Sequence, residues 1–333
     1  MWFERLSDSA LIHHDRMWWP FLILTALYAG VYALVLIKSQ KGVVSWRKVL
    51  RSAFMTNVWK RSTTRVDLKV YVVNYLVAIL MGLTVASAFG GVVYSVATLL
   101  GAAPVTAEYV TYGPLACIAV TLLVVASLDF AYWAAHAMAH KIPALWAFHR
   151  LHHSAERLTP LTAARKHPVE AVVQNLCIVF IAGPLQGIVA AAFGGLDYYL
   201  LFGANAVTFL YNATTANLRH THVRINFPAP FCYIFSTPAQ HQIHHSRLPH
   251  HWDMNYGRLF STWDVIFRTF YNPAPGEKIS YGLSEEFGVK RPRPHQTLKD
   301  SMLEPFQFLD RKNKALAEAQ QPSTTPEAAD APC

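Results

Sequence analysis

The sequence has little charge and few cysteines for its length. Only 15% of its 333 residues are charged, against roughly 25% in a typical soluble domain. The four cysteines are scattered and form no CxxC pair, which argues against a disulfide framework, a thiolate metal site and an iron–sulfur centre. HExxH, GxGxxG and Walker motifs are also absent from the sequence. These absences disfavour zinc-dependent hydrolysis and nucleotide binding, and any redox chemistry would need electrons from a separate protein.

Long apolar runs take the place of charge. Trp18–Ile37 is a run of 20 uncharged residues, about 30 Å as a helix, which is enough to cross a bilayer. The alternative is a signal peptide, whose apolar region is usually about 7–15 residues long. Further apolar blocks predict an all-α integral membrane bundle with four or five membrane segments. They cover 70–101, 113–135, 171–193 and 196–217. We expect a break at Gly90-Gly91 in the first block, and Pro184 interrupts the third. The last two blocks would form a hairpin that spans or re-enters the bilayer.

Basic residues predict the orientation of this bundle. The formal net charge is +9, and nine Lys and Arg residues lie between positions 38 and 69, whereas 102–112 has none. Cytoplasmic loops carry such an excess. We therefore expect the first loop and the segment after residue 135 to face the cytoplasm. This topology explains the charge without a nucleic-acid partner.

Histidine is the residue in excess. Thirteen of the sixteen histidines lie between positions 136 and 251, and eight of them form three groups. Residues three and four apart share a helix face, so their imidazoles can converge on a metal. Adjacent histidines diverge by about 100°, so two ions fit the pattern better than one, as in bundles where Glu-x-x-His motifs bind two irons. Imidazole suits iron, zinc, copper and nickel alike.

The order of these groups resembles that of a known family. The stretches DFAYWAAHAMAH, LWAFHRLHH, TAARKHPVE, NLRHTHV, STPAQHQIHHS and NYGRLFSTWDVIF, within about 63–281, are similar to the membrane fatty acid hydroxylase and sterol desaturase superfamily. The resemblance implies a cytoplasmic cap in which two iron ions activate O2 and oxidise a lipid. Its iron ligands would be His136, His140, His149, His152, His153, His241, His244 and His245.

One ligand of the family pattern is missing. Many relatives have a histidine just before the residue that matches Asn217, where this chain has Thr215 and Ala216. His220 and His222 are the available substitutes, and the sequence does not choose between them.

Residues beside the histidine groups also suggest roles. Asp129 lies two helical turns before His136, so it either orients a ligand imidazole or lies at the membrane surface. Glu170, near the start of an apolar helix, either supports the site or only complements the helix dipole. Ser236-Thr237-Pro238 predicts a helix start. His250 and His251 are expected at the rim rather than among the ligands.

The predicted function is O2-dependent hydroxylation of a lipid C–H bond. The resemblance admits fatty acyl chains, sterols and aminolipids such as ornithine lipid as substrates, with electrons from a ferredoxin or reductase, and a desaturase with the same site is the alternative. A histidine-rich metal transporter or storage protein is the rival of another class. We divide the chain into membrane segments and a basic loop (1–112), a histidine-box hydroxylase domain (113–281) and a tail (282–333) that is disordered from about 312.

Overall fold

The computed structural model describes residues 16–39, 46–53, 62–102, 113–201, 204–284 and 293–319. The fold is all-α, as predicted; within these ranges the β-structure is one short hairpin of β1 (Leu200–Leu201) and β2 (Ala204–Asn205). The longer helices are α2 (Trp19–Ser39), α3 (Trp46–Ala53), α5 (Ser62–Leu99), α6 (Pro114–Lys141), α7 (Pro143–His153), α8 (Pro168–Cys177), α9 (Gly183–Phe193) and α14 (Leu298–Ala319).

Shorter helices connect these elements. They are the 3-10 helices η1 (Pro160–Ala164), η4 (Leu218–His220) and η5 (Pro249–His251), the π-helices η2 (Ile178–Ala182) and η3 (Asn212–Ala216), and the helices α10 (Ala206–Tyr211), α11 (Phe231–Ile234), α12 (Pro238–His244) and α13 (Thr262–Ile266).

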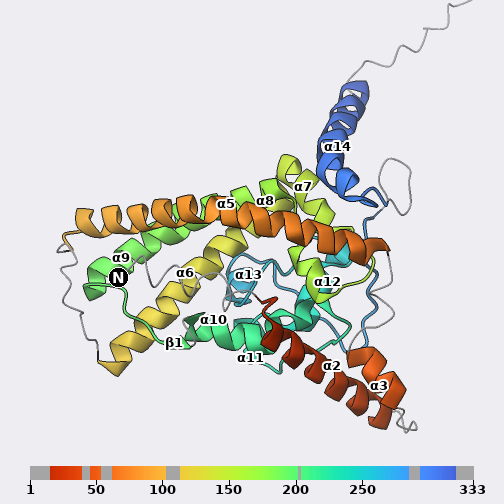
Figure 1. Cartoon of the computed structure of the whole chain (residues 1–333), viewed down its shortest axis with the longest axis horizontal. Coiled ribbons are helices and arrows are strands. Elements are labelled where there is room, and N and C mark those ends of the chain that lie inside the picture. The colour runs from red at the N-terminus through yellow and green to blue at the C-terminus, as the bar shows by residue number, and fades with distance from the viewer. Residues whose placement is uncertain are drawn as a thin grey trace, which may run out of the picture.

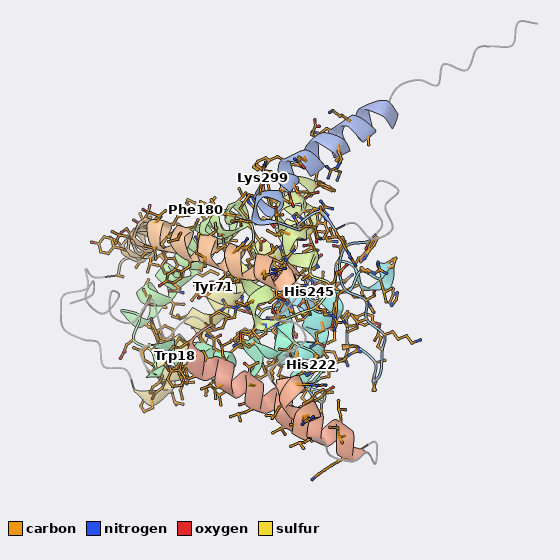
Figure 2. The ribbon with its side chains drawn as sticks, turned by 45° about the vertical axis from the view of Figure 1, so that its right-hand side comes forward. Trp18, Tyr71, Phe180, His222, His245 and Lys299 are labelled. Atoms are coloured by element: carbon orange, nitrogen blue, oxygen red, sulfur yellow. The ribbon has the colours of Figure 1, made fainter. Side chains whose placement is uncertain are left out.

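Four stretches of the described chain are long and apolar enough to cross a membrane: Trp19–Lys38, Thr64–Leu99, Pro114–Lys141 and Pro168–Phe193. Large apolar side chains on them are exposed, among them Leu80 and Leu83 on α5 and Phe180 in η2. Figure 2 shows such side chains, including the labelled Phe180, projecting from the outer surfaces of these helices. In water this surface would be costly to leave uncovered, whereas lipid chains would cover it.

Helix α5 is continuous where the sequence predicted a break. It runs through Gly90 and Gly91 for 38 residues, which corresponds to about 57 Å. The expected break at these glycines is therefore wrong. A glycine pair lowers helix stability by only about 1 kcal/mol per residue, and a break within lipid would leave several backbone groups without hydrogen bonds, which costs more.

The chain also continues through Pro184. Helices α8 and α9 are joined by the π-helical turn of η2, and Pro184 lies in the first turn of α9. A π-turn changes the hydrogen-bond register, which accommodates a residue without an N–H. Gly187 lets α9 approach α5 closely, because a Cβ there would lie 2.6 Å from Cβ of Val96.

Two other segments differ from the sequence prediction. Residues 196–217 contain β1, β2, α10 and η3 instead of a long helix, so they are not a fifth candidate span. Helix α14 continues past residue 312 to Ala319, because its sequence there consists of good helix formers such as Ala, Lys, Leu and Glu. The expected onset of disorder at 312 is therefore wrong; residues 320–333 lie outside the described chain.

Two contacts fix the histidine-rich part against α5. The guanidinium of Arg165, just after η1, forms a buried ion pair with Asp67 of α5, with Nη1 and Oδ1 2.6 Å apart. Nδ2 of Asn74, two turns further along α5, donates to the carbonyls of Ala164 and Lys166. In the view of Figure 1, α7 and α8 lie above α5, and α12 and α13 lie below it.

Candidate metal centre

The first two histidine groups lie on two consecutive helices. His136 and His140 are one turn apart near the end of α6, and α7 carries His149, His152 and His153. Only Ile142, in an extended conformation, separates the two helices. This sharp corner brings α7 back to the end of α6, so the histidines of both helices come together.

The third group lies on α12, whose start is fixed by the predicted capping sequence. Thr237 is the N-cap; its Oγ1 accepts from the backbone N of Gln240, and its own backbone N donates to Oε1 of Gln240. Such a capping box satisfies two N–H groups at the helix start. It places His241 and His244 in the helix and His245 at its C-cap.

Nine histidines converge from these helices and from η4. The five-histidine group, as we call it, consists of His136, His140, His149, His153 and His244, and the four-histidine group consists of His152, His220, His241 and His245. Within each group the nearest ligand nitrogens lie within 4.8 Å of one another. The adjacent pairs His152–His153 and His244–His245 are divided between the groups, as their divergence around a helix predicts.

The distances between the histidine nitrogens fit the coordination of metal ions. In the four-histidine group, Nε2 of His241 lies 3.0 Å from Nε2 of His220, and Nε2 of His245 lies 3.1 Å from both. In the five-histidine group, Nε2 of His149 and Nε2 of His153 are 3.2 Å apart. Two imidazole nitrogens bound about 2.0–2.1 Å from one ion at a tetrahedral angle lie about 3.3 Å apart. Each group therefore has the dimensions of a mononuclear nitrogen site.

Burial favours the neutral form of several of these imidazoles. It lowers the pKa of His152, His220 and His245 well below the usual range, and it lowers the pKa of His244 to about 3. Nε2 of His136, His140 and His244 is buried without a hydrogen-bond partner. Unpaired buried nitrogens destabilise a fold unless something binds them. Neutral rings with a free lone pair are the form that binds metals.

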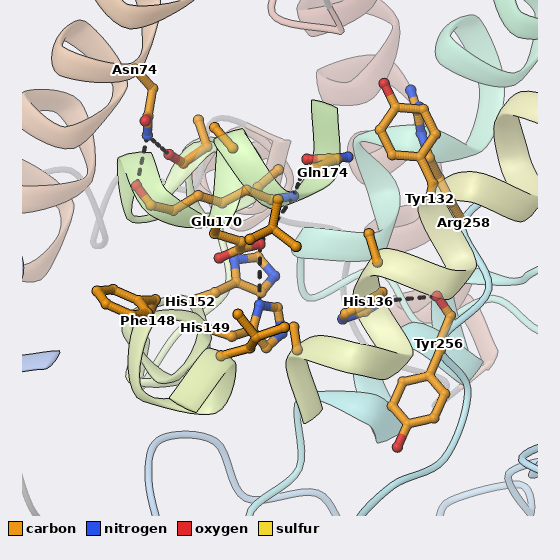
Figure 3. Close-up of a pocket in the computed structure, with 18 of the residues that line it drawn as sticks. Asn74, Tyr132, His136, Phe148, His149, His152, Glu170, Gln174, Tyr256 and Arg258 are labelled. Carbon is orange, nitrogen blue, oxygen red and sulfur yellow. Dashed lines mark hydrogen bonds and ion pairs between the residues drawn. The ribbon is translucent and has the colours of Figure 1, made fainter. Parts of the chain in front are cut away.

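Carbonyl and carboxylate oxygens orient the five-histidine group. Nδ1 of His136 lies 2.9 Å from the carbonyl oxygen of Tyr256, and Nδ1 of His244 lies 2.9 Å from that of Met254. Oε1 of the buried Glu170 lies 3.1 Å from Nδ1 of His149. Figure 3 shows this pair and the His136–Tyr256 contact. The two carbonyls accept the Nδ1 protons of His136 and His244, which leaves the lone pairs of these rings on Nε2. Glu170 thus lies beside a histidine of the site, which agrees with a supporting role rather than one that only complements the helix dipole.

A cation instead lies behind the four-histidine group. Nη2 of Arg219 is 2.5 Å from Nδ1 of His241 and also donates to the carbonyl of Gly257. Nη1 of Arg219 donates to the hydroxyl of Tyr211. A guanidinium can only donate, so Nδ1 of His241 accepts here, and the proton of the neutral ring lies on Nε2, which would release it on binding a metal. Arg219 had no predicted role, because most of its partners lie far away in the chain and the histidines are the conspicuous residues of NLRHTHV.

Asp129 has a different role from the one expected. Its carboxylate accepts from the backbone N of Leu259, the backbone N of Phe260 and Nε1 of Trp263, and these partners are backbone and indole groups rather than an imidazole. A carboxylate two turns from His136 along α6 is about 10 Å from it, so it reaches the chain after α12 instead. The expectation that Asp129 orients a ligand imidazole directly is therefore corrected: it anchors the segment 256–260.

Asp264 anchors the other end of that segment. It accepts from the backbone N of Tyr256, the backbone N of Gly257 and Nε1 of Trp133. Gly257 is required here, because a Cβ would lie 2.5 Å from the carbonyl oxygen of Phe260. Asp264 lies in the WDVIF stretch, but the sequence predicted no role for it. The segment 256–260 contacts both groups, through the Tyr256 carbonyl and through the Gly257 carbonyl that Arg219 binds.

The structure brings His220 into the site and leaves His222 out of it. His222 is exposed and belongs to neither group, and Figure 2 shows it apart from His245. His251 is fully buried rather than at a rim, with Nε2 2.6 Å from Oε1 of Glu277. In η5, Pro249 and His250 are exposed, and only His251 turns its ring inward, towards Glu277. His250, His251 and Glu277 lie close enough to bind an ion, but Glu277 also accepts from Tyr271 and Ala274, as part of a hydrogen-bonded loop.

Comparison with known proteins agrees with the site. Residues 121–269 match the fatty acid hydroxylase family. The ornithine lipid hydroxylase OlsE of Rhizobium tropici is 33% identical over 51% of this chain and 47% of its own length. The human alkylglycerol monooxygenase is 34% identical over 50% of this chain and 33% of its own.

A third relative shows how widely the reactions vary. The very-long-chain aldehyde decarbonylase GL1-1 of Oryza sativa subsp. indica is 30% identical over 44% of this chain and 22% of its own. This chain thus matches less than half the length of each of these relatives. No solved structure matches it significantly.

Proposed function

We propose that the protein is an O2-dependent membrane oxidoreductase that hydroxylates a C–H bond of a lipid. The observation that carries this proposal is the pair of histidine groups: nine imidazoles, seven buried and two half-buried, divided between two sites near the ends of candidate membrane spans. The named activities of OlsE and of alkylglycerol monooxygenase support lipid oxidation. The overall reaction combines R–H, O2, two electrons and two protons to give R–OH and water.

Two iron ions, when bound, supply the redox chemistry that activates O2. The residues of this chain hold and shield them. His136, His140, His149, His153 and His244 would hold one ion, and His152, His220, His241 and His245 the other. The carbonyls of Tyr256 and Met254 would hold the Nδ1 protons of His136 and His244, which leaves the lone pairs of these rings on Nε2, and Glu170 lies beside His149. Burial of seven of the nine histidines limits the access of water to the site and so suppresses side reactions there.

We further propose that residues 113–281 form the hydroxylase domain and that the histidine site faces the cytoplasm of a bacterial inner membrane. The basic residues between 38 and 69 support this orientation. A ferredoxin or reductase would deliver the electrons there. Reporter fusions after Trp46 and Lys312 should both indicate a cytoplasmic location. A periplasmic result after Lys312 would place the site away from such donors and contradict the mechanism.

The function is tested by metal analysis and by lipid mass spectrometry. Protein purified without chelator should contain two metal ions per chain, and a host expressing it under 18O2 should gain a lipid heavier by one labelled oxygen. Loss of two hydrogens without labelled oxygen would indicate a desaturase. Bound metal without any change in lipid in the native host, with a working reductase, would favour metal storage or transport.

A further inference from the structure

A cavity of about 430 Å³ adjoins the histidine groups. Its wall includes His136 and His149 of the five-histidine group and His152, His220 and His241 of the four-histidine group. The same wall includes Asn74 of α5 and Gln174 of α8, which belong to candidate membrane spans. The cavity thus connects the proposed metal centre with the helices that would contact lipid. Its volume is at the low end of the range for ligand sites, roughly 300–1,000 Å³, so it accommodates only part of a two-chain lipid.

The cavity wall is strongly cationic. Arg16, Lys166, Arg219 and Arg258 line it, and Glu170 is the one carboxylate among the described lining residues. Glu170 is shared between two bases, since its Oε1 lies 3.1 Å from Nδ1 of His149 and 3.3 Å from Nζ of Lys166. The excess of positive charge therefore persists after this ion pair is counted.

The cations differ in how strongly the protein already engages them. Arg219 donates to Tyr211, Gly257 and His241, so it is a structural element. Arg258 is stacked on Tyr132, with its Cζ 4.3 Å from the ring centroid, as Figure 3 shows. Lys166 donates to Oε1 of Gln174 over 3.3 Å, a long bond. Arg258 also hydrogen-bonds Tyr132, and Lys166 is paired with Glu170. A guanidinium has five N–H donors and an ammonium three, so both residues keep donors for an acidic ligand.

Other basic residues of the same region are committed elsewhere. Arg150 forms a buried ion pair with Glu304 of α14, and Arg165 forms one with Asp67. Arg157 is exposed and does not line the cavity. Only some of the basic residues in this part of the chain therefore line the cavity. They lie beside the imidazoles rather than on the outer surface.

We propose that the cavity binds the head of a lipid with an acidic group, a phosphate or a carboxylate, held by Lys166 and Arg258. This inference rests on the proposed function and specifies its substrate class. Because the cations and the imidazoles share one wall, the oxidised C–H bond belongs to the part of the lipid next to its acidic group. The acyl chain extends towards α5 and α8.

The test compares three probes with the same short acyl chain: a lysophosphatidic acid, an N-acylglycine and the neutral monoacylglycerol. Binding to the purified full chain in detergent is measured by equilibrium dialysis, without added metal. Both acidic probes should bind roughly tenfold more tightly than the neutral one, since one charge-assisted hydrogen bond corresponds to about that factor. A preference between the two acidic probes would distinguish phosphate from carboxylate as the natural group.

Variants connect this preference to the two residues. Lys166→Gln and Arg258→Gln should each weaken binding of the acidic probes roughly tenfold and leave the neutral probe unchanged. Lys166→Arg and Arg258→Lys should retain binding, which separates loss of charge from loss of folding. Lys314→Gln, at an exposed lysine of α14, is the matched control and should have no effect. Equal binding of acidic and neutral probes, or an equal loss in Lys314→Gln, would overturn the inference.

Oxidation of the same probes separates this inference from the proposed function. If the iron-loaded protein with a reductase oxidises the monoacylglycerol as well as the acidic probes, the function holds and the inference is wrong. If the acidic probes bind as expected but none is oxidised, the acidic-ligand site holds and the assignment as a hydroxylase is contradicted.

Discussion

The two histidine groups differ in the number of their ligands and in the charge of the groups next to their Nδ1 atoms. The five-histidine group has carbonyl and carboxylate oxygens behind it, including Glu170 beside His149. The four-histidine group has the guanidinium of Arg219 behind His241. A carboxylate makes an imidazole a better electron donor, and a cation makes it a poorer one. We infer that two ions bound here would not be equivalent: the one in the five-histidine group would be held more tightly.

The largest expected effect comes from removing a ligand of the smaller group. His245→Ala leaves three histidines there, so metal content should fall from two ions to one per chain, and lipid oxidation should fall to background. His140→Ala leaves four histidines in the larger group and should retain more metal. Elemental analysis of protein purified without chelator measures both. A full complement of metal in His245→Ala, or a greater loss in His140→Ala, would contradict the comparison.

Acidification should destabilise the metal-free protein strongly. The pKa of His244 is about 3 in the folded chain because of burial, against about 6.5 in an unfolded chain. The unfolded state therefore binds more protons between these values, and stability falls as the pH falls through this window. At about pH 5 this histidine alone costs about 2 kcal/mol. The midpoint of thermal unfolding, followed by circular dichroism, should decrease steadily below about pH 6.5. A midpoint that is the same at about pH 8 and about pH 5 would argue against buried neutral rings.

Glu170→Gln should weaken the five-histidine group alone. The substitution keeps the shape of the side chain but removes the charge beside His149, and loss of such a partner typically weakens metal binding about 10–100-fold. Competition with a chromogenic chelator would show one ion released more readily and the other unchanged. Glu156→Gln, at an exposed carboxylate paired with Arg293, is the matched control. Equal weakening of both ions would show that the two groups are not independent.

Asp129→Asn should affect both groups together. The amide would place an N–H against the backbone N–H groups of Leu259 and Phe260, which the carboxylate now accepts. Loss of such buried hydrogen bonds costs about 1–3 kcal/mol. Because the segment 256–260 contacts both groups, thermal stability and the affinity for both ions should decrease. Weakening of the five-histidine group alone would instead favour a direct role of Asp129 in orienting His136.

The smallest effect is expected for His222→Ala. This exposed side chain belongs to neither group, and surface substitutions usually change stability by about 0.5 kcal/mol or less. Metal content and activity should stay those of the unsubstituted protein, whereas His220→Ala should lose the ion of the four-histidine group. The reverse result would reassign the ligand.

Local spacing in the sequence predicted much of the site. The features that depend on long-range contacts could not be predicted in this way. The division of His152 from His153 follows from helix geometry, and the start of α12 follows from Thr237 and Pro238. The choice between His220 and His222 depends on a 3-10 turn, where no helical period applies. Asp129 reaches partners 130 residues further along the chain, and no local pattern reveals such a pairing. The continuity of α5 through Gly90 was missed for a related reason: the propensity of glycine is local, whereas the cost of a broken helix depends on the surrounding lipid.

Because of the length of α5, the position of the metal centre along the membrane normal should depend on the thickness of the membrane. At about 57 Å, the helix exceeds the hydrocarbon core of a bilayer, about 30 Å. Helices that are too long for a bilayer tilt, by an amount that depends on its thickness. Asp67 and Asn74 of this helix bind Arg165 and the carbonyls of Ala164 and Lys166. A change in lipid composition that alters this tilt should therefore raise or lower the nine histidines relative to the lipid headgroups, and so change which carbon of a substrate meets them.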